Sequence, residues 1–280
     1  MRKIRIITDS ASDISQEEAK KYGLSVIPLK TIFSDGEYLD GVTISYDEFY
    51  KKLIETREIP KTSQINAFSY EEEFKKYPDE DLLVITISSK VSGCYQSAVI
   101  ASEDYDNVYI VDSMNVSIGE QLLIKYAFQL INEGKNIHEI VDELNSIKDK
   151  VLPIALLDTL EYLKKGGRIS YAKAFVGTIL SIKPVCAVLD GKVTPVGKAR
   201  GSKNGNNMLR EMVRKVGVDF TKPFCAAYSG LDDTLVKKYL EDSKDLYPDI
   251  DIKDIPIRTV GSTIGTHVGP GAIAVAFFRK

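Results

Sequence analysis

The chain has 280 residues, of which 44% are hydrophobic and 28% charged, close to globular averages. This length predicts about two domains, and 40 acidic against 37 basic side chains leave a net charge of −3. Because a dedicated nucleic-acid binder usually shows a basic face, we expect no nucleic-acid partner. With only two histidines, His138 and His267, a histidine-rich metal site is impossible. We therefore expect neither a metal nor another cofactor.

The three cysteines are too few and too widely spaced for a disulfide framework or a zinc ribbon. Free thiols fit a reducing cytoplasm. The apolar run near the N-terminus is interrupted at Asp9 and is too short for a signal peptide. No stretch approaches the roughly 20 apolar residues of a membrane span. The sequence thus predicts a soluble, cytoplasmic protein without stable membrane insertion.

The first half alternates apolar strands with helical patterns, which is typical of βαβ units and a parallel sheet. We predict strands at residues 4–10, 24–29, 82–87 and 108–112. Helices are expected to begin at Asp13 and to cover residues 46–54, 96–102 and 119–133.

The second half is patterned differently. Strands are expected at residues 151–157, 224–228, 252–257 and 273–278, with a hairpin of 183–189 and 192–197 around Asp190-Gly191, and helices at 158–164, 202–215 and 231–243. The predicted fold is α/β, with an N-terminal parallel-sheet α/β/α domain (1–150) and a smaller C-terminal α+β domain (151–280).

Polar turns follow the apolar strands of the first half, at residues 8–10, 88–94 and 112–113, and residues 62–64 form a further polar loop. Ligands bind at the carboxyl ends of strands in open α/β sheets. These turns supply hydroxyls and backbone N–H groups, which suit an anionic head group such as a carboxylate. Each turn by itself is equally well explained as a helix cap.

Residues 261–272 contain four glycines and His267, and we expect a loop there that approaches a ligand closely. A dinucleotide site is rejected because the chain lacks the acidic residue about 20 positions further on. His267 could bind an anion, shuttle a proton or serve as a structural residue. His138 is expected to be an exposed residue at a helix start.

Arg168 and Arg200 lie in basic turns that could receive a phosphate or an acidic partner surface, or could simply be solvated. Cys94 follows Gly93 near a helix start, where a thiolate is favoured. A Cys–His enzyme with His267 as the base is therefore conceivable, but we favour the interpretation that Cys94 is a small apolar packing residue. No nucleophile-elbow motif is present.

Together, and in this order along the chain, these segments resemble the DegV family of bacterial fatty-acid-binding proteins. The matching stretches are residues 7–13, 61–64, 88–98, 111–113, 160–170, 183–184 and 264–272. They span almost the whole chain, and in combination they are highly specific.

The resemblance implies a non-catalytic carrier that holds a long-chain fatty acid between or within its domains. By this resemblance Thr62 and Ser92 hold the carboxylate with His267 nearby, and Arg168 and Arg200 lie near the mouth. The ligand-binding set that we expect is Thr62, Ser63, Ser92, Gly93, Cys94, Arg168, Arg200 and His267. Some family members pass the fatty acid to a separate fatty acid kinase, which makes an acyl-phosphate for phospholipid synthesis.

Two departures from the family pattern stand close to the expected head-group site. Ile65-Asn66 replaces the frequent Pro-Ser, and Cys94 replaces a frequent Thr. If that Thr binds the head group, Thr62 and Ser92 carry more of the contact here. Apolar residues such as Phe33, Ile179, Leu180 and Phe277 could wall the tail, although core packing explains each of them equally well.

Two alternatives remain open from the sequence. The first is an enzyme that acts on a small acyl or phosphorylated substrate through His267 and the Ser/Asp loops. The second is a regulatory binding module, whose target surface the sequence does not reveal.

Overall fold

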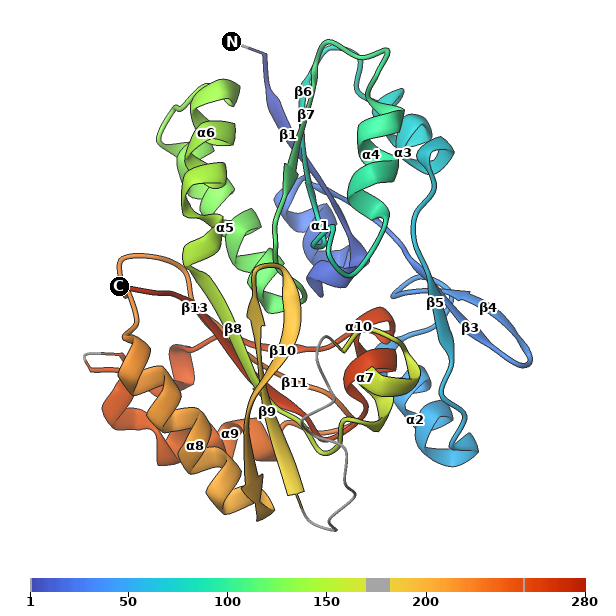
Figure 1. Ribbon diagram of the computed structural model, residues 1–280. Coiled ribbons are helices and arrows are strands. Elements are labelled where there is room, and N and C mark those ends of the chain that lie inside the picture. Colours follow the sequence, from blue (N-terminus) through green and yellow to red (C-terminus); the bar gives the residue numbers. More distant parts are fainter. Residues whose placement is uncertain (1, 170–181, 249) are drawn as a thin grey trace.

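The structure is a computed structural model that describes residues 2–169, 182–248 and 250–280. Three sheets organise it, with strand orders β2-β1-β6-β7, β10-β9-β8-β13-β11-β12 and β4-β3-β5. Figure 1 shows the first sheet above the second, and the small third sheet beside the junction between them. No helix in the described ranges has the length and apolar character that a bilayer crossing requires.

The four-stranded sheet confirms the predicted parallel α/β/α unit. Its strands β1 (Ile4–Asp9), β2 (Ser25–Ile27), β6 (Asp81–Thr86) and β7 (Val108–Asp112) all pair in parallel. On one side of it lie α3 (Ala67–Phe74) and α4 (Cys94–Ala101), and on the other α5 (Ile118–Asn132) and α6 (Ile137–Ile147) (Figure 1). Helix α1 (Gln16–Tyr22) begins three residues after Asp13, because Ser15 caps it.

The six-stranded sheet is mixed, as an α+β unit requires. It contains β8 (Val151–Leu156), β9 (Ile182–Leu189), β10 (Lys192–Arg200), β11 (Cys225–Tyr228), β12 (Ile257–Thr259) and β13 (Ile273–Phe278). The predicted hairpin is confirmed: β9 pairs antiparallel with β10, and Asp190 and Gly191 both have positive φ, as a tight turn demands. Helices α8 (Gly201–Val216) and α9 (Thr234–Asp242) pack against this sheet, at lower left in Figure 1.

The small antiparallel sheet was not predicted. Strands β3 (Lys30–Phe33), β4 (Gly36–Leu39) and β5 (Lys61–Ser63) are three or four residues long and lack an apolar run. Thr62 and Ser63 therefore lie on a strand and not in the expected loop. Thr62 pairs with Thr31 across the sheet. Helix α2 (Tyr46–Thr56) confirms the pattern seen at residues 46–54.

Two further expectations were wrong. Residues 262–268 of the glycine-rich segment form helix α10 (Ser262–Val268), which contacts α2, β3, β5 and α7 (Glu161–Lys165). The strand expected at 252–257 is a 3-10 turn (Ile252–Asp254) followed by the short β12. Pro256 has no amide hydrogen to continue a ladder, although its carbonyl accepts from the Ala226 N–H at 2.9 Å.

The hydrophobic core joins the two halves of the chain. All strands of the four-stranded sheet precede residue 113, and all strands of the six-stranded sheet follow residue 150. The core beneath the first sheet nevertheless includes Cys225, Val260, Ile264 and Phe278 from the second half. Helix α5 contacts β6 on one side and β8, β11 and β13 on the other. The domain division at residue 150 stays a prediction.

Candidate functional site

A partly polar cavity lies where the small sheet, α10 and the loop before α4 meet. Four of the expected ligand-binding residues line it. Thr62 lies on β5 and His267 on α10, and the other two are Ser92 and Arg168. The other lining residues are Leu29, Gln64, Ile87, Val91, Val116, Leu163, Val193, Thr263, Ile264 and Val268.

The central polar pair of this cavity is Thr62 and His267. Thr62 Oγ1 and His267 Nε2 are 2.9 Å apart, while His267 Nδ1 is buried without a hydrogen-bond partner in the described structure. Burial first, and then the nearby Arg168 guanidinium, lower the pKa of His267 to about 4. The imidazole is therefore neutral near pH 7 and can offer one N–H.

Ser92 is positioned by the start of α4. Its hydroxyl donates to Cys94 Sγ at 3.2 Å, and the Cys94 N–H donates to Ser92 Oγ at 3.4 Å. Because a thiol is a weak acceptor, the Ser92 hydroxyl hydrogen is readily given to a stronger acceptor in the cavity. A carboxylate between Thr62 and Ser92 is such an acceptor.

Gln64 is a lining residue that the predicted set omitted, although it follows Thr62-Ser63 directly. Its Nε2 donates to Ser97 Oγ at 3.1 Å. A side chain at Gly93 would place Cβ 2.1 Å from Gln64 Oε1, so glycine at this position leaves room for the Gln64 amide. Gly93 thus shapes the site without lining it.

The structure does not place the remaining expected residues on the cavity wall. Cys94 is buried in the core beside Ser92, and burial raises the pKa of its thiol to about 12. The Ser63 hydroxyl donates to the Gln64 carbonyl at 3.4 Å. Arg200 is exposed at the end of β10. Their roles in binding stay predictions.

The polar turns at residues 8–10 and 112–113 hold the cavity loop in place. Asp9 Oδ2 accepts from the Ile87 N–H at 2.8 Å, and Asp112 Oδ1 accepts from the Ser89 N–H at 3.1 Å. Both bonds tie the segment leading to Ser92 to neighbouring strand ends. Asp9 and Asp112 therefore position the loop that carries Ser92, and neither lines the cavity.

Helix α10 is anchored at its start by two buried aspartate side chains. Asp40 accepts from the Ser262 and Thr263 N–H groups at 2.8 and 3.2 Å, and Asp13 accepts from the Gly261 N–H at 2.8 Å. These oxygens accept from N–H groups that have no partner within the first turn of a helix. This anchorage fixes the helix that carries His267.

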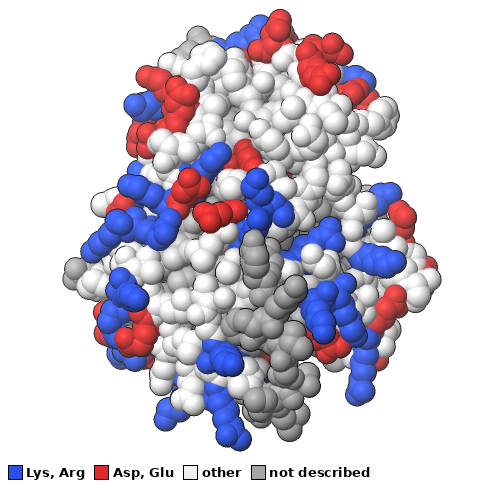
Figure 2. Space-filling model, viewed as in Figure 1, with Lys and Arg blue, Asp and Glu red and all other residues white. Residues whose placement is uncertain are grey.

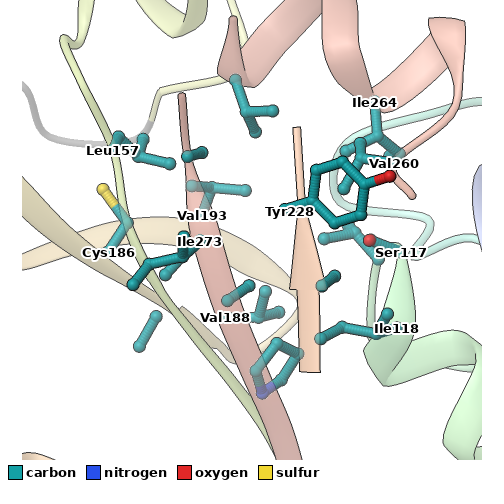
Figure 3. Close-up of a pocket in the computed structure, with 18 residues that line it drawn as sticks. Ser117, Ile118, Leu157, Cys186, Val188, Val193, Tyr228, Val260, Ile264 and Ile273 are labelled. Carbon is teal, nitrogen blue, oxygen red and sulfur yellow. The ribbon is translucent and has the colours of Figure 1, made fainter. Parts of the chain in front are cut away.

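A second, apolar cavity adjoins the polar one (Figure 3). The two cavities share the wall residues Val116, Val193, Ile264 and Val268. Figure 3 shows side chains such as Leu157, Cys186, Val188, Val260 and Ile273 around the apolar space.

The two labelled hydroxyl groups in Figure 3, on Ser117 and Tyr228, already have partners. Ser117 donates to Asp13, and Tyr228 is bonded to Thr259. The expected wall residues Phe33 and Phe277 pack in other core clusters, and Ile179 and Leu180 lie outside the described residues. Taken together, the two cavities are polar on the side of Thr62 and Ser92 and apolar on the side of β8, β9 and β13.

Fold and cavities together define a class: an α/β protein with a partly polar cavity that adjoins an apolar one. The comparisons refine this class. A model described as "Uncharacterised protein, DegV family" matches residues 3–280, and the chain belongs to the DegV family. A DegV domain-containing protein of Caldanaerobacter subterraneus is 35% identical, with all of both chains covered.

Solved structures agree with this assignment. A DegV lipid-binding protein from Thermotoga maritima has 30% identity and a TM-score of 0.86, with 99% of this chain and 98% of that chain covered. A DegV family protein from Thermus thermophilus, described as binding fatty acid, has 29% identity and a TM-score of 0.88 over the whole of both chains.

In the ranges that the structure describes, no three His, Cys, Asp or Glu side chains come together as metal ligands.

Proposed function

We propose that this protein binds a long-chain fatty acid, with the carboxylate between Thr62 and Ser92 and the tail in the apolar cavity. The observation that carries the proposal is the shared wall between a hydroxyl-lined cavity and an apolar one. The similarity to the fatty-acid-binding protein of Thermus thermophilus supports the same ligand class.

The energetics favour such an amphiphile. Burying about 14 methylenes contributes roughly 11 kcal/mol before the costs of binding, at about 0.8 kcal/mol each. Each hydrogen bond to the charged carboxylate adds about 1.5–3 kcal/mol. The tail therefore dominates the affinity, and the hydroxyls of Thr62 and Ser92 select the head group.

The enzyme alternative has less support from the geometry. His267 has a pKa of about 4, which makes it a weak base at neutral pH. Burial keeps the Cys94 thiol protonated, and Cys94 does not line the cavity. A catalytic role would predict turnover of a small acyl or phosphorylated substrate that His267→Ala removes.

We also propose that the bound carboxylate is presented to a separate fatty acid kinase, and that the protein is itself not an enzyme. Arg168 is exposed at the edge of the polar cavity, and its guanidinium is held by the carbonyls of Val91 and Gly166. Figure 2 shows several Lys and Arg side chains towards the right of the visible face, where Figure 1 places α7, with Asp and Glu among them. The Lys and Arg side chains there suit an acidic partner.

The binding proposal is tested by mass spectrometry of an organic extract of the purified protein. We expect a co-purified fatty acid from the wild type and none from Thr62→Val/Ser92→Ala. The control is Thr56→Val/Ser146→Ala, which removes two exposed hydroxyls outside the cavity. If lipid-free wild type binds neither palmitate nor oleate by calorimetry, the proposal is wrong.

A further inference from the structure

A third cavity lies away from the proposed fatty-acid site, between α1, α5 and β12. Its volume is about 280 Å³, close to the lower end of small-molecule sites at roughly 300 Å³. None of its lining residues lines the polar or the apolar cavity. It is therefore a separate space that the proposed function does not use.

The charges on its wall leave one positive charge without a counter-ion. Arg258 Nη1 pairs with Glu18 Oε1 at 2.6 Å, and Arg258 Nε donates to Gln121 Oε1 at 3.2 Å. Lys125 lies one turn beyond Gln121 on α5. Its ammonium makes no ion pair or hydrogen bond with any residue that the structure describes, so two cations face one carboxylate.

Lys125 is held in surroundings that disfavour its charge. Burial, and additionally the Arg258 guanidinium, lower the pKa of the Lys125 ammonium. A half-buried cation without a partner is costly, and an anion placed beside it offsets that cost. The unpaired positive charge therefore favours a ligand that carries a single negative charge.

The opposite part of the wall is apolar and aromatic. The rings of Tyr22 and Phe128 are tilted against each other with centroids 6.2 Å apart, and Ile124 lies on the same wall. The Tyr22 side chain is 54% exposed although it lines the cavity. A ligand with an apolar body would cover this ring.

We propose that this cavity binds a small monocarboxylate with an aromatic or short aliphatic body. The carboxylate lies against the Lys125 ammonium, and the body packs on Tyr22 and Phe128. A phosphate monoester carries about −1.5 to −2 charges at pH 7, which exceeds the one unbalanced positive charge and brings repulsion from Glu18. The charge balance therefore favours a carboxylate.

The test is a calorimetric titration of the full-length protein with 4-phenylbutyrate, in the presence of saturating palmitate. We expect saturable binding that weakens about tenfold or more in Lys125→Gln and in Tyr22→Ala. The control Lys135→Gln makes the same charge change at an exposed residue outside the cavity and should bind as the wild type does. The neutral 4-phenylbutan-1-ol should bind at least tenfold more weakly than the carboxylate.

Three results would overturn this proposal. One is the absence of binding at millimolar 4-phenylbutyrate, and another is unchanged affinity in both Lys125→Gln and Tyr22→Ala. The third is competition by palmitate, which would place the probe in the fatty-acid cavity. Binding of 4-phenylbutyrate in the Lys125 and Tyr22 variants can be measured even if the protein does not bind palmitate. Failure of the fatty-acid proposal is therefore distinguishable from failure of this one.

Discussion

Thr62 and His267 are 205 positions apart in the chain and hydrogen-bonded in the structure. When His267 carries its proton on Nε2, that N–H donates to Thr62 Oγ1. The Thr62 hydroxyl hydrogen is then free to donate to a carboxylate. We propose that the neutral imidazole positions the Thr62 hydroxyl in this way.

The pH dependence of stability should report this buried imidazole. The unfolded chain takes up a proton at His267 below pH 6.5, whereas the folded protein does so only near pH 4. Stability is therefore lost as the pH falls from 6.5 to 4, by up to about 3 kcal/mol. The unfolding free energy is measured in urea at pH 7 and at pH 4.5. Between these pH values it should fall by about 2 kcal/mol less in His267→Gln than in the wild type.

His138→Gln is the control, because it removes an exposed imidazole at the start of α6. The comparison must be between variants, since buried acids act in the opposite direction. Burial raises the pKa of Asp9 to about 7 and of Asp13 to about 8, so their contribution to stability falls as the pH rises from about 4 to 8. Equal pH dependence in wild type and His267→Gln would contradict the assignment.

At the scale of elements, α10 shows where local sequence misleads. Its glycines predict a loop, yet residues 262–268 are helical because Asp40, more than 200 positions earlier, accepts from the first helical N–H groups. Gly265 has a packing reason as well. A Cβ there would lie 2.6 Å from Phe49 Cε1 and 2.7 Å from the Tyr50 hydroxyl of α2.

Gly265→Ala should therefore push α10 away from α2. We expect a loss of about 1–3 kcal/mol in unfolding free energy, as for other overpacked cores. Fatty-acid affinity should fall as well, because α10 supplies His267, Ile264 and Val268 to the cavities. Urea denaturation and calorimetry with palmitate measure the two effects.

A second substitution makes this prediction specific. Phe49→Leu removes the Cε1 atom that the new methyl group would meet, so it should restore part of the lost affinity in the Gly265→Ala background. If Gly265→Ala alone binds palmitate as tightly as the wild type, the position of α10 does not control the site.

At the scale of the whole molecule, the core and the cavities join the two halves. The apolar cavity is lined by Val116 and Ile118 from the first half and by β8, β9, β11 and β13 from the second. We therefore expect the halves to unfold together, although their sheets are separate.

The three buried cysteines allow unfolding to be measured separately in each half of the chain. Cys94 reports on the first half, and Cys186 and Cys225 report on the second. In pulsed thiol labelling across a urea series, all three should become reactive at the same midpoint. Two separate midpoints would instead show that residues 1–150 and 151–280 are independently stable domains.

The ligand should stabilise both halves at once. Free palmitate at 100 times its Kd adds about 2.7 kcal/mol to the unfolding free energy, or roughly 5 °C in Tm for a chain of this size. The labelling midpoints of Cys94 and Cys225 should shift equally. A shift confined to one cysteine would place the fatty acid within one half.

The sequence by itself determined the elements whose signals are local. Apolar runs predict β1, β6, β7, β8 and β13, because buried strands need such runs. The Asp190-Gly191 pair predicts its hairpin, because a tight turn needs two residues of positive φ. The motifs that indicate the DegV family are also local, because each is a short stretch of adjacent residues.

Only the tertiary structure decided the site itself. Short β5 has no apolar pattern and forms because β3 pairs with it, and α10 forms on a cap supplied by Asp40. The meeting of Thr62 with His267 and the loss of the imidazole charge follow from burial among distant segments. Long-range contacts and desolvation leave no local mark in a sequence, so the set of lining residues could be anticipated only in part.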